Sequence, residues 1–169
     1  MGYSLRRYAP GQGDKLAEFV LPIATRTYSN WVDPVAAGMW AESEHGAGAW
    51  KDRLDDESTH VLVCERAGGS IAACAFVRIG SGTAFFGGLY VADVSRGLGT
   101  LLRDERLRIS REAGAATAVM LIRETNVPAR KLAERAGFEL VAEDPCTRLS
   151  AVTRLLYAKP LEAPALLPA

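Results

Sequence analysis

The chain has 169 residues, of which 49% are hydrophobic and 24% are charged. These values are ordinary for a globular domain and exclude wholesale disorder. Twenty basic residues balance twenty acidic ones, which removes the electrostatic case for a dedicated nucleic-acid-binding protein. No apolar run reaches the ~18 residues that a membrane-spanning helix needs, and the N-terminal residues lack the apolar core of a signal peptide. We therefore expect a cytoplasmic protein with neither a membrane nor a nucleic-acid partner.

The three cysteines are Cys64, Cys74 and Cys146. An odd number of cysteines without clustered spacing argues against a disulfide framework or a zinc site, so we expect no metal. Free cysteines are typical of proteins in a reducing compartment. Cys64 and Cys74 should lie on neighbouring strands as ordinary core residues.

The first part of the chain predicts a strand followed by two helices. Residues 4–8 have the pattern of a short strand, and apolar residues recur at helical spacing from Asp14 onward. Pro22 is expected to kink or break that helix, because proline lacks the N–H donor and clashes with the preceding turn. Asp33 and Pro34 are an N-cap residue and a first-turn proline, so a second helix should begin there and be interrupted at Gly46 and Gly48.

Three strands are expected next, at residues 60–66, 70–79 and 83–91, and glycine-rich turns should join them into an antiparallel meander. Beyond a glycine-bracketed turn, a helix begins near Leu98 and ends at Gly114. The pattern then predicts a strand, a helix and two closing strands, at residues 116–122, 129–136, 138–143 and 151–159.

This order of elements predicts the fold class. A strand–helix–strand unit inside an otherwise antiparallel sheet indicates a mixed α/β domain with three layers, in which helices cover a central sheet. We expect a mixed, mostly antiparallel sheet of about seven strands in an α/β/α arrangement. Residues 1–159 should form a single domain, and residues 160–169 a C-terminal tail.

The strongest chemical signal lies where the strand ending in Leu89-Tyr90-Val91 leads into the next helix. Gly97 and Gly99 carry no Cβ there, so backbone N–H groups can approach a ligand closely. A helix start adds unpaired N–H donors and the positive end of the helix dipole, which together predict a phosphate or pyrophosphate site. A turn that needs glycine only for its geometry is the alternative. A Walker A loop fits worse, because no Lys-Ser/Thr follows the last glycine. A dinucleotide-binding fingerprint also fits worse, because it belongs to the first unit of an all-parallel fold, whereas three antiparallel strands precede this loop.

This segment resembles the signature of the GCN5-related N-acetyltransferase (GNAT) family. The family has an L-x-V-like triplet at a strand end, followed by R/Q-x-x-G-x-G/A at the start of a helix, and the triplet, Arg96, Gly97 and Gly99 match it. The family's second signature, N-x-x-A-x-x-x-Y-x-x-x-G-F, is matched at Asn126, Ala129, Gly137 and Phe138. The element order is also similar, so the resemblance covers roughly residues 4–159.

The resemblance implies an acyl-CoA-dependent N-acyltransferase. The simplest reaction is transfer of acetyl from the co-substrate acetyl-CoA to a primary amine, on a small molecule or a peptide, by direct attack. Backbone groups of the strand and the loop hold coenzyme A (CoA) in this family. The implied CoA-binding residues are Leu89, Tyr90, Val91, Arg96, Gly97, Leu98, Gly99, Thr100 and Asn126.

Three positions depart from the family pattern. The last G/A of the loop falls on Leu101, the tyrosine that often protonates the leaving thiolate falls on Ala133, and a frequent glutamate before the triplet is replaced by Gly87-Gly88. Replacement donors could be Tyr8, Tyr28 or Tyr157. Two alternatives therefore stay open: a catalytically weak or inactive acyl-CoA-binding regulatory domain, and a structural module whose glycines serve only the turn.

The acceptor side is predicted from charge. Residues 33–57 carry seven acidic and two basic residues, a net charge of −5, whereas residues 96–135 carry nine basic and five acidic ones, a net charge of +4. An acidic region attracts cations, so we expect a cationic amine acceptor. Candidates for the base or for steering the acceptor are Glu42, Glu44 and His60, and His45 is a further candidate base. The three tryptophans could line the acceptor pocket or anchor the core.

The sequence does not predict the oligomeric state, and a homodimer is one option.

Overall fold

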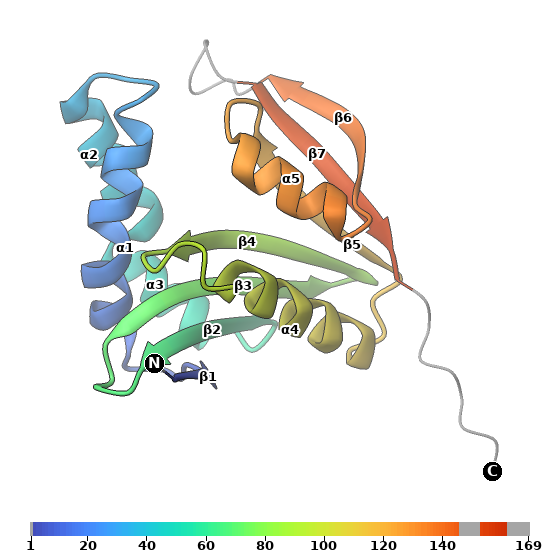
Figure 1. Ribbon diagram of the computed structural model, residues 1–169, viewed down its shortest axis with the longest axis horizontal. Helices are drawn as coiled ribbons and strands as arrows, with labels where there is room; N and C mark the ends of the chain where they lie inside the picture. The colour runs from blue at the N-terminus through green and yellow to red at the C-terminus, as the bar shows by residue number, and fades with distance from the viewer. Residues whose placement is uncertain (1, 146–152, 162–169) are drawn as a thin grey trace. The chain divides into compact units, whose positions relative to one another are not determined.

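The computed structural model describes residues 2–145 and 153–161 (Figure 1). The seven strands described form one sheet in the order β1-β2-β3-β4-β5-β7-β6. Strands β4 and β5 are parallel, whereas β1 with β2, β5 with β7 and β6 with β7 are antiparallel. The expected α/β class, with a mixed and mostly antiparallel seven-stranded sheet, is confirmed.

The chain divides into two compact units. Unit 1 comprises Met1–Phe76 and Gly88–Leu102, and unit 2 comprises Val77–Gly87 and Arg103–Ala169. The single domain expected over residues 1–159 stays a prediction. The expected tail lies outside the described residues from position 162 onward.

Three helices follow one another within residues 13–55, one more than expected there. Helix α1 (Gly13–Tyr28) runs without a break through Pro22. Of the two expected effects of this proline, a kink or a break, the break is wrong and the kink stays a prediction. Pro22 is exposed, so solvent can satisfy the carbonyl group that loses its N–H partner. The opposite face of the helix is fully buried and holds it together, at Leu16, Val20 and Ala24.

Helix α2 (Pro34–His45) begins as expected. The Asp33 side chain accepts hydrogen bonds from the backbone N–H groups of Val35 and Ala36, both at 3.0 Å. Gly46, with an extended backbone (φ −65°, ψ 169°), ends α2 and precedes α3 (Ala47–Asp55). Gly46 therefore interrupts the helical region as predicted, whereas Gly48 lies inside α3.

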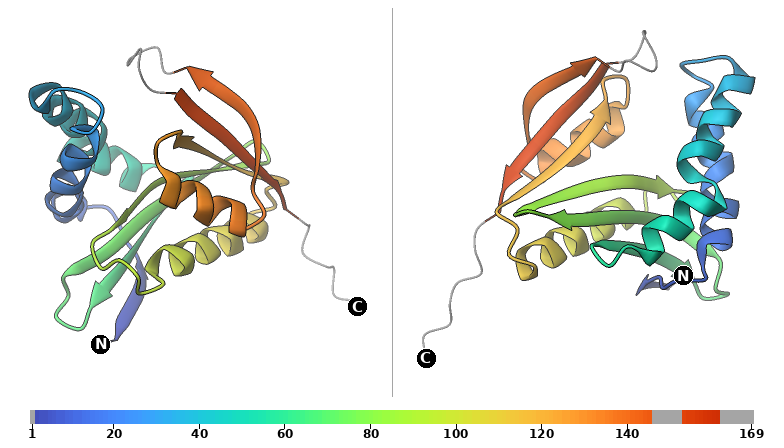
Figure 2. Two further views of the ribbon diagram at one scale, coloured as in Figure 1. Left: turned by 45° about the horizontal axis from the view of Figure 1, so that its top comes forward. Right: turned by 180° about the vertical axis from the view of Figure 1, so that it is seen from behind.

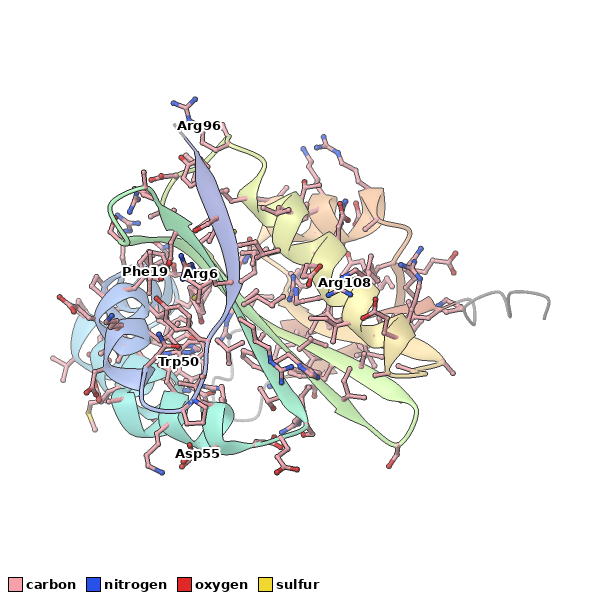
Figure 3. All side chains as sticks on the ribbon, turned by 90° about the horizontal axis from the view of Figure 1, so that it is seen from below. Arg6, Phe19, Trp50, Asp55, Arg96 and Arg108 are labelled. Atoms are coloured by element: carbon pink, nitrogen blue, oxygen red, sulfur yellow. The ribbon has the colours of Figure 1, made fainter. Side chains whose placement is uncertain are left out.

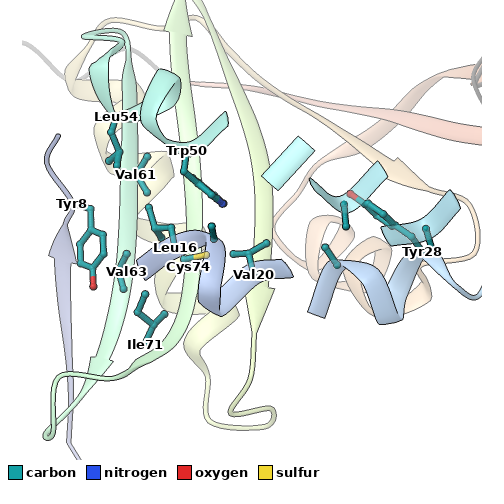
Figure 4. Packing of buried hydrophobic residues seen from close by; sticks show 14 residues of the cluster. Tyr8, Leu16, Val20, Tyr28, Trp50, Leu54, Val61, Val63, Ile71 and Cys74 are labelled. Atoms are coloured by element: carbon teal, nitrogen blue, oxygen red, sulfur yellow. The ribbon is translucent and has the colours of Figure 1, made fainter. Parts of the chain in front are cut away.

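The strands of unit 1 pack against these helices. Strand β1 (Tyr3–Arg7) pairs with β2 (Thr59–Arg66), and a turn with Gly69 at φ +79° leads into β3 (Ile71–Gly80). The buried core of the unit includes Trp50, whose side chain is fully buried (Figure 4). Cys64 and Cys74 are buried free thiols, as expected, and Cys146 lies outside the described residues.

Unit 2 contains the parallel strand pair. Strand β4 (Thr83–Val91) pairs with β5 (Thr117–Arg123) only over Thr83–Phe86, and β5 pairs along its whole length with β7 (Thr153–Pro160). Figure 2 shows β7 beside the last strand of the sheet, β6 (Glu139–Pro145).

Two helices complete the fold, and glycines end both of them. Helix α4 (Leu98–Glu112) is followed by Gly114 at φ +73°, and α5 (Val127–Arg135) by Gly137 at φ +78°. The core of unit 2 joins residues of these helices to the strands, including Phe86, Leu107, Ala133, Phe138 and Tyr157. No helix in the described part of the chain is long and apolar enough to cross a membrane.

Candidate functional site

Eight of the nine predicted CoA-binding residues lie on one continuous segment of unit 1, from the end of β4 to the first turn of α4. Ser95 and Gly97 turn the chain into the helix with positive φ angles of 62° and 76°. Nothing lies within 4 Å of the position that a Cβ would occupy on Gly97. Glycine is therefore favoured there by the backbone conformation rather than by lack of space.

The first turn of α4 follows the loop directly, and its role as a phosphate site stays a prediction. Leu98 is buried and anchors the helix start, Gly99 is half-buried, and Thr100 is exposed. The leading N–H groups of a helix have no acceptors within it, and the dipole adds positive charge. Leu101 donates its N–H to the Gly97 carbonyl at 3.0 Å. Leu101 replaces the last Gly/Ala of the family motif, but its N–H is already bonded within the helix and is therefore not one of the free donors at the helix start.

Two predicted residues differ in their surroundings. Arg96 is exposed at the tip of the loop, and its side chain points away from the ribbon (Figure 3). Asn126 belongs to unit 2, where its side chain accepts a hydrogen bond from the Ala129 N–H at 3.3 Å and caps α5. The described contact of Asn126 is therefore structural, and its predicted role toward CoA stays a prediction.

Gly88, which stands where a glutamate is frequent in the family, has crowded surroundings. Gly88 has φ +47°, and an added Cβ would lie 3.0 Å from Cε1 of Phe76 and 3.2 Å from Cε2 of Tyr90. Both the backbone angle and the two rings disfavour a side chain here. Gly88 therefore lets the Phe76 and Tyr90 rings pack closely beside β4, and a glutamate at this position does not fit this arrangement.

Tyr90, the middle residue of the triplet, is joined to a buried histidine. The Nε2 atom of His45 lies 2.6 Å from the Tyr90 hydroxyl oxygen and 2.9 Å from that of Tyr28. We call these three residues the Tyr–His–Tyr cluster. His45 is only 5% exposed. The cluster connects the ends of α1 and α2 to β4 within unit 1.

The protonation state of the cluster follows from its burial. Burial, followed by the nearby Arg53 charge, lowers the pKa of His45 to about 3. Burial also raises the pKa of Tyr90 well above its usual value. At neutral pH the histidine is therefore uncharged and the tyrosine keeps its proton. A group with so low a pKa is a poor proton acceptor for an alkylammonium with a pKa near ~10.4, which argues against His45 as the base.

The predicted base or steering candidates lie on two elements. Glu42 is exposed and Glu44 is partly buried, and both share α2 with His45. His60 is half-buried at the start of β2, where burial and then the Arg7 charge lower its pKa. The two glutamates and His60 thus come from different elements, and their catalytic roles stay predictions.

Several acidic residues of the 33–57 region have local structural roles. Asp33 caps α2, Asp55 is paired with Lys51 within α3, and Asp56 accepts hydrogen bonds from Ser58 and Thr59.

The three tryptophans differ from one another in burial. Trp50 is a fully buried core residue. Trp31 and Trp40 are half-buried beside Tyr28, and their ring centroids lie 5.7 and 4.9 Å from the centroid of its ring.

The candidate proton donors are all engaged. Tyr8 donates to Glu65 at 2.8 Å, Tyr157 donates to Glu134 at 3.0 Å, and Tyr28 belongs to the Tyr–His–Tyr cluster. Ala133, at the position of the family tyrosine, is only 2% exposed and lies in the core of unit 2. A tyrosine introduced there would have to displace core side chains, so it would test packing rather than proton transfer.

Comparison with known proteins supports the resemblance. The model of the acetyltransferase (GNAT) family matches residues 21–138. No curated protein matches the chain.

Solved structures share the fold at low sequence identity. PaiA N-acetyltransferase from Thermoplasma acidophilum, in complex with coenzyme A, is 14% identical, with a TM-score of 0.81 over 95% of this chain and 99% of that one. A GNAT acetyltransferase from Staphylococcus aureus is 12% identical, with a TM-score of 0.75 over 95% and 100% of the two chains. A GNAT acetyltransferase from Streptococcus pneumoniae is 14% identical, with a TM-score of 0.70 over the same shares. With the family match over most of its length and this shared fold, the chain belongs to the GNAT acetyltransferase family.

Proposed function

We propose that the protein transfers an acetyl group from acetyl-CoA to a primary amine. The observation that carries the proposal is the segment from Leu89 to Thr100, in which a strand end, a loop with two positive φ angles and an open helix start follow one another. These features supply N–H donors for a pyrophosphate. Family membership supports the same assignment, as does the Thermoplasma acidophilum structure with the same fold, which was crystallised with coenzyme A.

The reaction proceeds by direct attack. The neutral amine nitrogen attacks the thioester carbonyl carbon, the C–S bond breaks, and the products are an amide, the CoA thiolate and one proton. Backbone N–H groups of Leu89–Val91 would polarise the carbonyl. Only about one alkylamine molecule in a thousand is neutral at pH 7.4, a deficit of roughly 4 kcal/mol, whereas a thiol with a pKa near ~8.5 leaves fairly well unaided. Proton removal from the amine therefore needs more help than thiolate departure, and Glu42, Glu44 or His60 could supply it, directly or through water.

A weakly active or inactive acyl-CoA-binding domain is the second candidate. Two observations favour it: Ala133 stands buried in place of the tyrosine donor, and Gly88 is packed where a glutamate is frequent in the family. Such a protein would bind acetyl-CoA without turning it over.

One set of measurements separates the two candidates. Calorimetry should show binding of acetyl-CoA, with 3′,5′-ADP as a competitor. Thiol release from acetyl-CoA is then followed with a panel of cationic, neutral and acidic amines. Amine-dependent thiol release supports the enzyme, and binding without release supports the regulatory domain. Absence of CoA binding contradicts both.

We predict that the preferred acceptor is cationic. The acidic stretch around Glu42 and Glu44 should raise the local concentration of cations. The value of kcat/KM for a cationic amine should then fall several-fold between 0.05 and 0.5 M salt, because the Debye length shrinks from roughly 14 to about 4 Å. Preference for anionic acceptors, or no response to salt, would contradict this prediction.

Two substitutions refine the acceptor test. Glu42→Gln and Glu44→Gln should raise KM more than they lower kcat if these side chains only steer the acceptor. If kcat collapses for one of them, that residue is the base. Glu139→Gln, at an exposed glutamate on β6 in unit 2, is the matched control.

A further inference from the structure

A carboxylate just after β4 anchors the start of the loop. Asp93 accepts two hydrogen bonds from Arg66, from Nη2 at 2.6 Å and from Nε at 3.0 Å, so the ion pair is bidentate. The hydroxyl of Tyr3 donates a third hydrogen bond to the same carboxylate at 2.9 Å. We call Tyr3, Arg66 and Asp93 the Asp93 clamp.

The clamp is itself held by neighbouring strands of unit 1. Nη1 of Arg66 donates to the Ile71 carbonyl at 2.7 Å and to the Ser70 hydroxyl at 3.1 Å. Tyr3 begins β1, Arg66 ends β2 and Ile71 begins β3. Three strands thus fix one carboxylate, and a bidentate Arg–carboxylate pair fixes orientation as well as distance.

The loop between the clamp and α4 has few restraints of its own. All four residues of the segment 94–97 are exposed, and Val94 is 70% exposed. The next buried side chain is Leu98, at the helix start. The loop conformation therefore depends mainly on its two ends. The Asp93 clamp and the backbone hydrogen bonds of Ala92 and Val94 hold the first end, and the packing of Leu98 holds the second.

One residue of the loop has an energetically unfavourable backbone conformation. Ser95 has φ +62°, which is uncommon for a residue with a side chain. Such a conformation persists only where the surrounding structure determines it. The side chains of the loop are exposed, so this role falls to the restraints at its N-terminal side. These are the Asp93 clamp and two backbone hydrogen bonds, from Val94 to Ala92 at 3.2 Å and from Ala92 to Ala72 at 2.9 Å.

The clamp also determines the charge at the start of the loop. The Arg66 hydrogen bonds, followed by that of Tyr3, lower the pKa of Asp93, so the carboxylate is ionised at neutral pH. Arg66 neutralises it, and Arg96 lies close enough to lower the same pKa further. Without Arg66, a bare carboxylate would stand at the start of a loop proposed to receive an anion.

We propose that the Asp93 clamp positions the loop for the pyrophosphate of CoA, with Asp93 and Arg66 as positioning residues that act through the backbone of residues 94–99. This proposal rests on the proposed function, because it needs a CoA-binding loop. It makes a selective claim: the clamp affects binding of the nucleotide part of the cofactor and leaves binding of its pantetheine arm unchanged.

The test compares two ligands on three variants. Calorimetry gives the Kd for CoA, and ligand-observed NMR gives the Kd for acetyl-pantetheine, which has no pyrophosphate. Asp93→Asn should raise the Kd for CoA about tenfold, because loss of the charge-assisted bidentate pair frees the start of the loop, and this loss outweighs the attraction of the unpaired Arg66 charge for the anion. Tyr3→Phe, which removes only one hydroxyl, should raise it about two- to threefold. Lys51→Met, which breaks an exposed ion pair with Asp55 on α3, should leave it unchanged. None of the three should change the Kd for acetyl-pantetheine.

Each failure has a distinct signature. Equal CoA affinity in the wild type and in both clamp variants overturns the proposal while leaving the proposed function intact. Parallel weakening of CoA and acetyl-pantetheine also overturns it, because the clamp would then support the fold in general. If the wild type binds acetyl-pantetheine but not CoA, both the clamp proposal and the proposed function fail. Tyr3→Phe keeps the test decisive should Asp93→Asn fold poorly.

Discussion

Gly99→Glu is expected to lower the affinity of the protein for CoA by at least a hundredfold. Gly99 is the second residue of α4 and is half-buried at the start of the helix. A carboxylate there would stand beside the proposed pyrophosphate. At an effective dielectric constant of about 20, two unit charges ~4 Å apart repel by about 4 kcal/mol, and about 2.7 kcal/mol already corresponds to a hundredfold change in Kd.

The chain offers a matched control for this substitution. Gly48 is the second residue of α3, is exposed, and has nothing within 4 Å of an added Cβ. Gly48→Glu therefore adds the same charge at the same helical position where no ligand is expected, and it should leave the Kd for CoA unchanged. Gly99→Gln separates bulk from charge and should weaken binding less than Gly99→Glu. Equal calorimetric affinities in the wild type and in Gly99→Glu would place the CoA site elsewhere.

Local signals explain why much of the fold could be predicted from the sequence. Asp33 followed by Pro34 specifies a helix start through contacts within three residues, and the structure has both cap hydrogen bonds. Gly114 and Gly137 end their helices at positive φ, where glycine carries no steric cost. The loop with Gly97 is a local signal of the same kind, so the turn into α4 can be predicted without knowledge of tertiary contacts, whereas CoA binding by this segment stays a prediction.

Pro22 shows where a local rule fails. A proline inside a helix costs a hydrogen bond and causes a clash, yet α1 continues because Leu16, Val20 and Ala24 are fully buried on the opposite face. Tertiary packing outweighs the local cost. No sequence pattern within α1 reveals how much apolar surface its partner elements will cover.

The interactions that sequence reasoning missed are long-range. His45 is hydrogen-bonded to Tyr28 and Tyr90, which are 17 and 45 positions away in the sequence. Asp93 is hydrogen-bonded to Arg66 and Tyr3, which are 27 and 90 positions away. Single residues at such separations leave no periodic signal in the sequence. His45 could be named as a candidate base from its residue type, but only its burial between two hydroxyls shows that it is a neutral hydrogen-bonding residue.

The buried His45 should make the protein strongly sensitive to acid. Its pKa is about 3 in the folded protein and 6.5 in the unfolded chain. Between these values the unfolded chain binds a proton that the folded protein does not, so the free energy of unfolding rises with pH and falls as pH is lowered. At 1.36 kcal/mol per pH unit below 6.5, the contribution lost between pH 7 and pH 4 is about 3 kcal/mol.

Comparison of variants isolates this contribution, because the chain has only two histidines. Urea unfolding at pH 7, 6, 5 and 4 should show a loss of stability that is about 3 kcal/mol larger in the wild type than in His45→Gln, whose amide can still bond to the tyrosine hydroxyls but does not titrate. His60→Gln removes the other histidine, which is less buried, and should keep the larger part of the pH dependence. Carboxylates that protonate near pH 4 act equally in all three proteins and cancel in the comparison. Identical pH dependence in the wild type and His45→Gln would mean that His45 is protonated within the folded protein, and that the Tyr–His–Tyr cluster opens to water.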